Sequence, residues 1–257
     1  MSNWIFLRGL TREARHWGKF PSIFQAAIPD VNIVMPDLPG NGELRHLTSP
    51  MHVCEMVEYC RQELATRGIS PPYYLLALSL GAMVSVEWAR RYPHELLGYV
   101  LINTSLRPFS SFYRRLRPRN YLLLLHMATF EHDAEKIELA ILRMTSHRSE
   151  QLTSVVKAWV TYRTDRPVTV LNTLRQMIAA ARYRAPMNRP DVPLLILAGA
   201  KDGLVDPRCS QTIFDRWKSP LHTHPEAGHD LPLDDGVWVV QRLQEWVAVL
   251  ALPVEVR

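Results

Sequence analysis

An apolar run over residues 73–77 is followed almost at once by Ser79 and by a helical pattern that begins at Leu80. The run is typical of a buried strand, so the sequence predicts that Ser79 lies at a sharp turn from strand to helix. At such a turn the serine hydroxyl is held beside the first amides of the helix, whose partial positive charge favours a negatively charged oxygen. Taken alone, the serine is equally well explained as a helix N-cap.

Short apolar runs alternate with helical patterns on both sides of this turn. The predicted strands lie at residues 4–7, 32–35, 73–77, 98–102, 192–197 and around 223, and the predicted helices at 17–27, 51–67, 80–92, 206–217 and 236–250. Such alternation is typical of a parallel sheet covered on both faces. We therefore predict an α/β fold with a mostly parallel, six-stranded sheet and helices on both faces.

One long segment breaks the alternation. Residues 103–188 contain helical patterns at 133–144, 149–162 and 168–181 and no convincing strand. An all-helical block between two sheet strands indicates a helical cap over the strand ends. We predict a core formed by residues 1–104 and 187–257, with an inserted cap over 105–186.

Asp202 and His229 are the residues that decide how Ser79 is interpreted. Asp202 follows a predicted strand and Gly199, at the sheet edge where sites on parallel sheets collect. It can orient a histidine or simply form an Asp-Gly turn, whereas Asp206, just before a helix, is predicted to be an N-cap.

His229 is the only one of ten histidines in a loop of small residues between a late strand and the last helix. We predict that it is the general base for Ser79. The backbone amides of Leu10 and Leu80 are the predicted oxyanion donors. The other histidines are interpreted as structural or solvated: His16, His46, His52, His94, His126, His132, His147, His222 and His224.

Ser, Asp and His occur along the chain in the order of the α/β-hydrolase triad. With residues 37–42 (DLPGNG), the Ser79 turn, residues 199–202 and Gly228-His229, the chain resembles the α/β-hydrolase superfamily over nearly its whole length. It is most similar to small, capped serine carboxylesterases of the pimeloyl-ester type. The resemblance implies hydrolysis of small-molecule carboxylic esters through an acyl-serine, with no cofactor and no metal.

The sequence departs from the family pattern at three positions. Ala77 replaces the first glycine of the serine turn, Asn41 replaces a common histidine, and Arg8 stands where histidine usually precedes Gly9. Arg8 either supports its loop or binds an acidic group, and we expect support.

Other functions compete with the carboxylesterase hypothesis. A thioesterase or ester hydrolase acting on acyl-carrier-protein or coenzyme A conjugates is the alternative, because Arg114, Arg115, Arg117 and Arg119 could pair with phosphate or an acidic carrier. The same cluster could be a solubilising surface of the cap. A non-catalytic binding module is disfavoured by the complete triad. Serine as nucleophile argues against the aspartate-dependent dehalogenases and epoxide hydrolases of this fold, and Met83 argues against the menaquinone-type lyase.

Composition narrows the setting further. The net charge of +5 comes mostly from dispersed arginines, which favours a solvated basic face over a nucleic-acid site. Three scattered cysteines indicate a reducing compartment. No secretory leader and no apolar run near 20 residues is visible, so we expect a cytoplasmic protein without a membrane span. The oligomeric state is not indicated.

Overall fold

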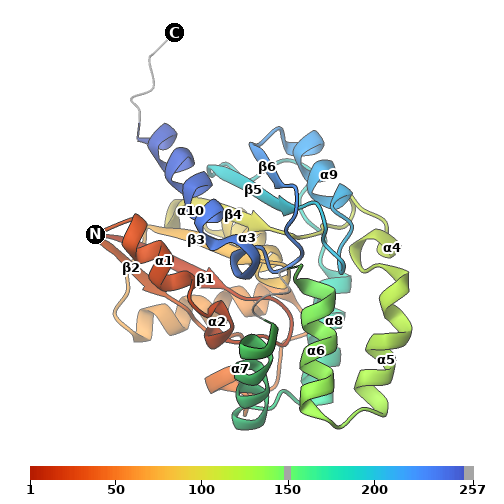
Figure 1. The fold of residues 1–257 in the computed structure, drawn as a ribbon. Coiled ribbons are helices and arrows are strands. Elements are labelled where there is room, and N and C mark those ends of the chain that lie inside the picture. The colour runs from red at the N-terminus through yellow and green to blue at the C-terminus, as the bar shows by residue number, and fades with distance from the viewer. Residues whose placement is uncertain (148–151, 252–257) are drawn as a thin grey trace.

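Six parallel strands form one sheet in the computed structural model, which describes residues 1–147 and 152–251 (Figure 1). The strands lie in the order β2-β1-β3-β4-β5-β6, and every pairing is parallel. The predicted α/β architecture is thereby confirmed. The strands are β1 (Ser2–Leu7), β2 (Val31–Val34), β3 (Tyr73–Leu78), β4 (Leu96–Ile102), β5 (Leu194–Gly199) and β6 (Leu221–His224).

Helices cover both faces of the sheet, because successive residues of a buried strand point to opposite sides and each side needs an apolar partner. Ile5 and Leu7 of β1 cluster with α2, α3 and α9, whereas Trp4 and Phe6 cluster with α1 and α10. These core helices are α1 (Phe20–Ala27), α2 (Val53–Thr66), α3 (Leu80–Arg91), α9 (Arg208–Trp217) and α10 (Leu231–Leu250).

Two core helices begin three or more residues away from their predicted starts. The helix expected over 17–27 begins at Phe20, because a short 3-10 helix, η1 (Ala14–Trp17), ends at Gly18 with a positive φ of 55°. The helix expected over 236–250 begins five residues earlier, at Leu231, with a proline in its first turn. Its backbone is non-helical at Asp235 (φ −149°), so Gly236 follows a kink and does not mark the start.

Between β4 and β5 the described chain is helical. Its elements are α4 (Phe112–Arg115), the 3-10 helix η4 (Pro118–Asn120), α5 (Tyr121–Thr129), α6 (Ala134–Thr145), α7 (Leu152–Asp165) and α8 (Val170–Arg182). The sequence predicted three of these helices and missed α4 and α5. The run that forms α5 has apolar residues on nearly all sides, so it lacks the one-sided periodicity that marks an amphipathic helix. Residues 149–151 of the helix predicted over 149–162 lie outside the described residues.

The chain leaves and re-enters the core at neighbouring points. Arg107 and Arg184 form an isolated parallel bridge, and the Ala185 amide donates to the Arg107 carbonyl at 2.7 Å. This is the connection expected of an inserted unit, which lies beside one end of the sheet (Figure 1). Within the described ranges, no helix is both long enough and apolar enough to cross a membrane.

Candidate active site

Ser79 occupies the predicted turn between β3 and α3. Its backbone has φ 57° and ψ −112°, a conformation that residues other than glycine rarely adopt. The residue is half-buried and stands at the N-cap position of α3, but its side chain makes no capping hydrogen bond. The N-cap interpretation therefore does not account for the serine, whereas a strained turn that exposes a hydroxyl is the geometry of a nucleophile.

Two glycines bring this turn against the end of β1. A Cβ atom on Gly81 would lie 2.5 Å from the Leu7 carbonyl oxygen and 2.7 Å from that of Arg8. A Cβ on Gly9 would lie 3.2 Å from the Cβ of Ser79. The loop after β1 therefore contacts the serine directly.

The two predicted oxyanion amides lie on these two contacting segments. Leu80 is the first residue of α3, so its amide has no preceding turn to accept its hydrogen. Among the described residues, the Leu10 amide has no acceptor either, although the next amide, of Thr11, donates to Gln176 at 2.8 Å. Both N–H groups are therefore available to a bound ligand.

Asp202 and His229 are brought together in a buried pair. The Nδ1 atom of His229 lies 2.7 Å from Oδ2 of Asp202, and their side chains are 5% and 1% exposed. The other carboxylate oxygen accepts from the amides of Leu204 and Val205 at 2.8 and 2.9 Å. The carboxylate is thus fixed on both oxygens, and a proton on Nδ1 leaves Nε2 of His229 able to accept one.

Asn103, which the sequence analysis did not single out, joins the loops that carry this pair. It follows β4 with a positive φ of 46° and is buried. Its Nδ2 donates to the carbonyls of Gly228 (2.9 Å) and His229 (2.8 Å), and its Oδ1 accepts from the Gly199 amide at 2.8 Å. Its place at the carboxyl end of a strand was the available signal, since asparagine tolerates positive φ better than most residues.

The same two loops also touch through their backbones. A Cβ on Gly199 would lie 2.3 Å from the Gly228 carbonyl oxygen and 2.4 Å from that of Ala227. Only glycine fits at this approach, which places the end of β5 beside the histidine loop. Gly199 therefore has a packing role in the site besides terminating a strand.

Arg8 has an internal partner, as expected for a residue that supports its loop. Its guanidinium group donates to both carboxylate oxygens of Asp230, at 3.2 and 2.6 Å, and lies over the Trp17 ring. Both charged side chains are buried. Because Asp230 directly follows His229, this ion pair joins the loop after β1 to the histidine loop.

The cap segment contacts the histidine loop at the end of α6. The Thr145 carbonyl accepts from the Asp230 amide at 2.7 Å. Buried Asp234 accepts from the Gly228 amide at 2.6 Å, from the His147 amide at 3.2 Å and from the Ser146 hydroxyl. The histidine loop is therefore held by the cap segment as well as by the core.

Asp206 lies close to its predicted place. Its carboxylate accepts from the Arg208 amide at 3.0 Å at the start of α9, although Pro207 occupies the N-cap position. A hydrogen bond from the Arg208 guanidinium group lowers the pKa of Asp206. It contributes to the start of a helix, and within the described residues no hydrogen bond joins it to His229.

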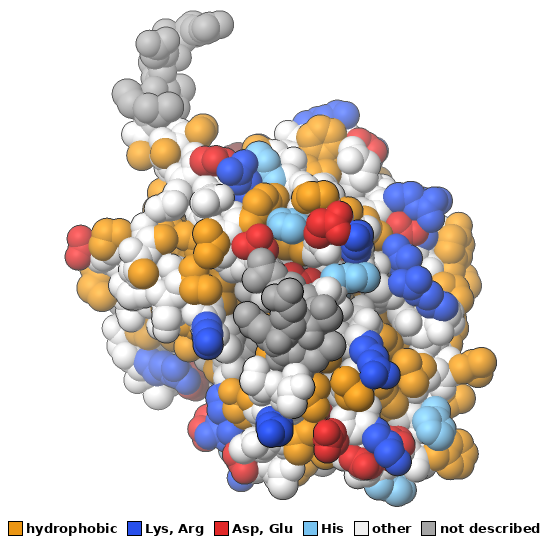
Figure 2. Space-filling view, in the orientation of Figure 1, with side chains coloured by type: hydrophobic (Ala, Val, Ile, Leu, Met, Phe, Trp, Pro, Cys, Tyr) orange, Lys and Arg blue, Asp and Glu red, His pale blue; other side chains and the backbone are white. Residues whose placement is uncertain are grey.

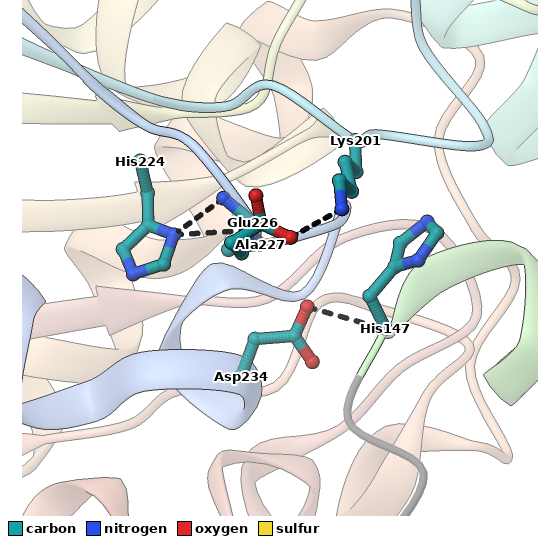
Figure 3. A pocket seen from close by; sticks show the side chains of 6 residues that line it. All are labelled: His147, Lys201, His224, Glu226, Ala227 and Asp234. Carbon is teal, nitrogen blue, oxygen red and sulfur yellow. Dashed lines mark hydrogen bonds and ion pairs between the residues drawn. The ribbon is translucent and has the colours of Figure 1, made fainter.

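A depression of about 200 Å³ is lined in part by residues that follow β5 and β6 (Figure 3). In it, Lys201 pairs with Glu226, and Nδ1 of His224 accepts from the Glu226 and Ala227 amides. None of Ser79, Asp202 and His229 lines it. Its lining residues are His147, Lys201, His224, Glu226, Ala227 and Asp234.

The parallel sheet, the inserted helices and the serine turn together define a serine hydrolase of the α/β-hydrolase fold. The chain belongs to the family described as serine aminopeptidase, S33, whose model matches residues 27–236. This confirms the superfamily that the sequence motifs indicated.

Relatives and solved structures agree with this assignment. A curated relative, pimeloyl-[acyl-carrier protein] methyl ester esterase from Serratia marcescens, is 25% identical over 220 residues, covering 83% of this chain and 80% of the relative. An esterase from Rhodococcus sp. ECU1013 has a TM-score of 0.79 at 16% identity, over 97% of this chain and 91% of that one. A thermophilic esterase from Thermogutta terrifontis has a TM-score of 0.76 at 18% identity, over 98% and 91%. These structural matches support the fold.

Proposed function

We propose that the chain is a carboxylesterase in which Ser79, Asp202 and His229 form the catalytic triad. The observation that carries the proposal is the buried Asp202–His229 pair at 2.7 Å, in a chain whose Ser79 is held in the strained turn of a nucleophile. The names of the curated relatives, all of them methyl ester esterases, support an ester substrate. A cytoplasmic location, supported by three free cysteines, is part of the same proposal.

The proposed mechanism follows from the residues. Ser79 Oγ attacks the ester carbonyl carbon while Nε2 of His229 takes its proton, and Asp202 stabilises the imidazolium that forms. The Leu10 and Leu80 amides bind the oxyanion, each contributing roughly 3 kcal/mol to the transition state. His229 then protonates the departing alcohol, which leaves an acyl-serine. Water attacks this ester, again with His229 as base, and releases the acid and free Ser79.

Labelling and turnover test this proposal together. A fluorophosphonate probe should modify Ser79 in the folded wild type. The protein should also hydrolyse p-nitrophenyl esters, and a series of increasing acyl chain length should show which acyl group it hydrolyses fastest. Ser79→Ala should abolish both reactions and change the free energy of unfolding by no more than about 1 kcal/mol. Hydrolysis that survives in Ser79→Ala would remove Ser79 from the mechanism.

Carrier-linked substrates are a second candidate, favoured by the arginines of the cap. The guanidinium Nε atoms of Arg114, Arg115 and Arg117 are buried and have no hydrogen-bond partner. Within the described part of the chain no carboxylate pairs with these three or with Arg119, while Arg115 and Arg119 donate only to backbone carbonyls. Figure 2 shows Lys and Arg side chains along the edge where α4 lies in Figure 1.

These arginines lie beside the loop that carries Asp202, the proposed triad acid. An acidic carrier bound to them would therefore dock close to the site. The Arg117 amide donates to the Leu204 carbonyl at 3.0 Å, and the Asp206 amide donates to the Arg114 carbonyl at 2.9 Å. We expect kcat/KM for an acyl-carrier-protein methyl ester to fall with added salt and in Arg114→Glu, while hydrolysis of a free ester is unchanged. Arg67→Glu, at the C-cap of α2, is the control. Salt-insensitive turnover of the carrier substrate would contradict electrostatic docking.

A further inference from the structure

The loop that carries the Leu10 amide has a buried arginine on each side. Arg8 precedes Gly9-Leu10 and Arg12 follows it by two residues. Their side chains are only 6% and 10% exposed, and each meets a carboxylate from a different part of the molecule. Burying two cations this close together is unfavourable unless each is paired with an anion. Each of these arginines therefore needs its carboxylate partner in the folded protein.

Arg8 holds the first side of the loop. Its two hydrogen bonds to Asp230 use the planar, bidentate geometry that fixes orientation as well as distance. The guanidinium carbon lies 4.9 Å from the centre of the Trp17 ring. The first side of the loop is thereby tied to the residue after His229.

Arg12 holds the second side, and its partners belong to the cap. Its guanidinium group donates to Oε2 of Glu138 in α6 at 2.8 Å and lies 4.2 Å from the centre of the Trp159 ring in α7. Glu138, 1% exposed, also accepts from Nε of Arg163 in α7 at 2.6 Å. Arg12 therefore extends from the loop that carries the Leu10 amide into the contact between the cap helices α6 and α7.

The backbone between the arginines is held as well. Thr11 has a positive φ of 57°, and its amide donates to Oε1 of Gln176 in α8. The Arg12 carbonyl accepts from Nδ2 of Asn41 at 3.0 Å, and Asn41 accepts from Nε2 of Gln176 at 2.7 Å. Arg8, Thr11 and Arg12, which surround Leu10, are thus held by contacts to the histidine loop and to the cap.

We propose that Arg8 and Arg12 are positioning residues that aim the Leu10 amide, and that the Arg12–Glu138 pair makes this aim depend on the docked cap. The inference rests on the proposed function, because it gives the Leu10 amide an oxyanion to bind. Such an amide acts mainly in the transition state, so its misplacement lowers kcat more than it changes KM.

Glu138→Gln tests the proposal, because it keeps the size of the side chain and removes the charge that holds Arg12. We expect kcat for p-nitrophenyl butyrate to fall about 10- to 100-fold, with KM changed less than about threefold. The affinity for a trifluoromethyl ketone, which forms an oxyanion on Ser79, should fall by a similar factor. Glu138→Asp, which restores the charge, should recover part of kcat.

Asp165→Asn is the matched control. It removes an ion pair between the same two parts of the molecule, Arg15 of η1 and Asp165 of α7 at 3.0 Å, but Asp165 is 52% exposed and does not contact the Leu10 loop. Its kcat should equal that of the wild type. A folded Glu138→Gln with unchanged kcat, or with a loss equal to that of Asp165→Asn, would overturn the proposal.

Arg12→Lys covers the case in which Glu138→Gln does not fold. It keeps a positive charge for Glu138 and loses the planar group over Trp159, so kcat should still fall while the circular dichroism spectrum is retained. Unchanged kcat in this variant would also overturn the proposal. Failure of the proposed function has a different signature: the wild type itself would neither hydrolyse esters nor react with a fluorophosphonate, and both proposals would then be wrong.

Discussion

Asn103 donates its side-chain amide to the backbone carbonyl of His229 at 2.8 Å, and so holds the loop of the predicted base from the end of β4. Asn103→Asp keeps the shape and the acceptor but loses both donors. We expect kcat to fall at least about tenfold and the free energy of unfolding to fall by about 2–4 kcal/mol, because two buried carbonyls lose their partners. Ester hydrolysis and urea unfolding measure the two effects. Asn32→Asp, on the edge strand β2, should leave kcat unchanged.

Asp202→Asn should lower kcat by about 10³- to 10⁴-fold with little change in stability. The amide can present N–H groups to His229 and favour the wrong imidazole tautomer, so Nε2 no longer accepts the Ser79 proton. Steady-state hydrolysis of a p-nitrophenyl ester measures the loss. Asp206→Asn is the control, since that carboxylate pairs with Arg208 at the start of α9. Equal losses in the two variants would argue against Asp202 as the triad acid.

Gly81→Ala should destabilise the protein by about 1–3 kcal/mol, although alanine is the better helix former. The added Cβ would lie 2.5 Å from the Leu7 carbonyl oxygen, so β1 and α3 must move apart. Urea unfolding measures the cost. Gly68→Ala, at a positive φ with open space around it, should lose only about 1 kcal/mol. A Gly81→Ala variant as stable as the wild type would contradict the close approach.

His16 should make the protein lose stability as the pH falls below about 6.5. Burial, followed by the charges of Arg12 and Arg8, lowers its pKa well below the ordinary value. The unfolded chain then takes up a proton that the folded chain does not, so the contribution is complete above pH 6.5 and is lost on acidification. When urea unfolding is measured at pH 7 and pH 5, the free energy of unfolding should fall less in His16→Gln than in the wild type. The difference should be at most about 1.4 kcal/mol per pH unit. Equal losses would contradict a buried neutral His16.

The three cysteines should react with a thiol reagent at different rates. Burial raises the pKa of Cys60 to about 12 and raises that of Cys209 as well, whereas Cys54 is partly exposed. Because the thiolate is the reactive form, the native protein at pH 8 should show one fast thiol, Cys54, and two slow ones. Cys54→Ser should abolish the fast phase, and all three thiols should react in urea. A fast phase that persists in Cys54→Ser would contradict the assignment.

The six strands and the two covered faces of the sheet follow from local signals. Apolar runs bounded by turn residues mark β1 to β6, and helices between them require parallel pairing. The residues proposed for the triad were also recognisable, because Ser79, Asp202 and His229 each follow a predicted strand and occur in the order of the family's triad. A pattern of this kind depends only on sequence neighbours.

Asn103, the Arg12–Glu138 pair and Asp234 were not recognisable in the same way. Each acts through partners far along the chain: Asn103 is 126 residues from His229, and Arg12 is 126 residues from Glu138. Such pairs are decided by how distant segments of the core and the cap pack together, which no local pattern encodes. Helix α5 was missed for the opposite reason, since its local composition carries no one-sided pattern.

The backbone conformation of Ser79 bears on any attempt to engineer this protein. A non-glycine residue at φ 57°, ψ −112° carries a cost on the order of 1–3 kcal/mol, which glycine would not have. A screen that selects only for heat resistance therefore rewards Ser79→Gly, a variant without a nucleophile. Thermal selection of this protein should be coupled to an activity readout, or the codon for residue 79 should be held fixed.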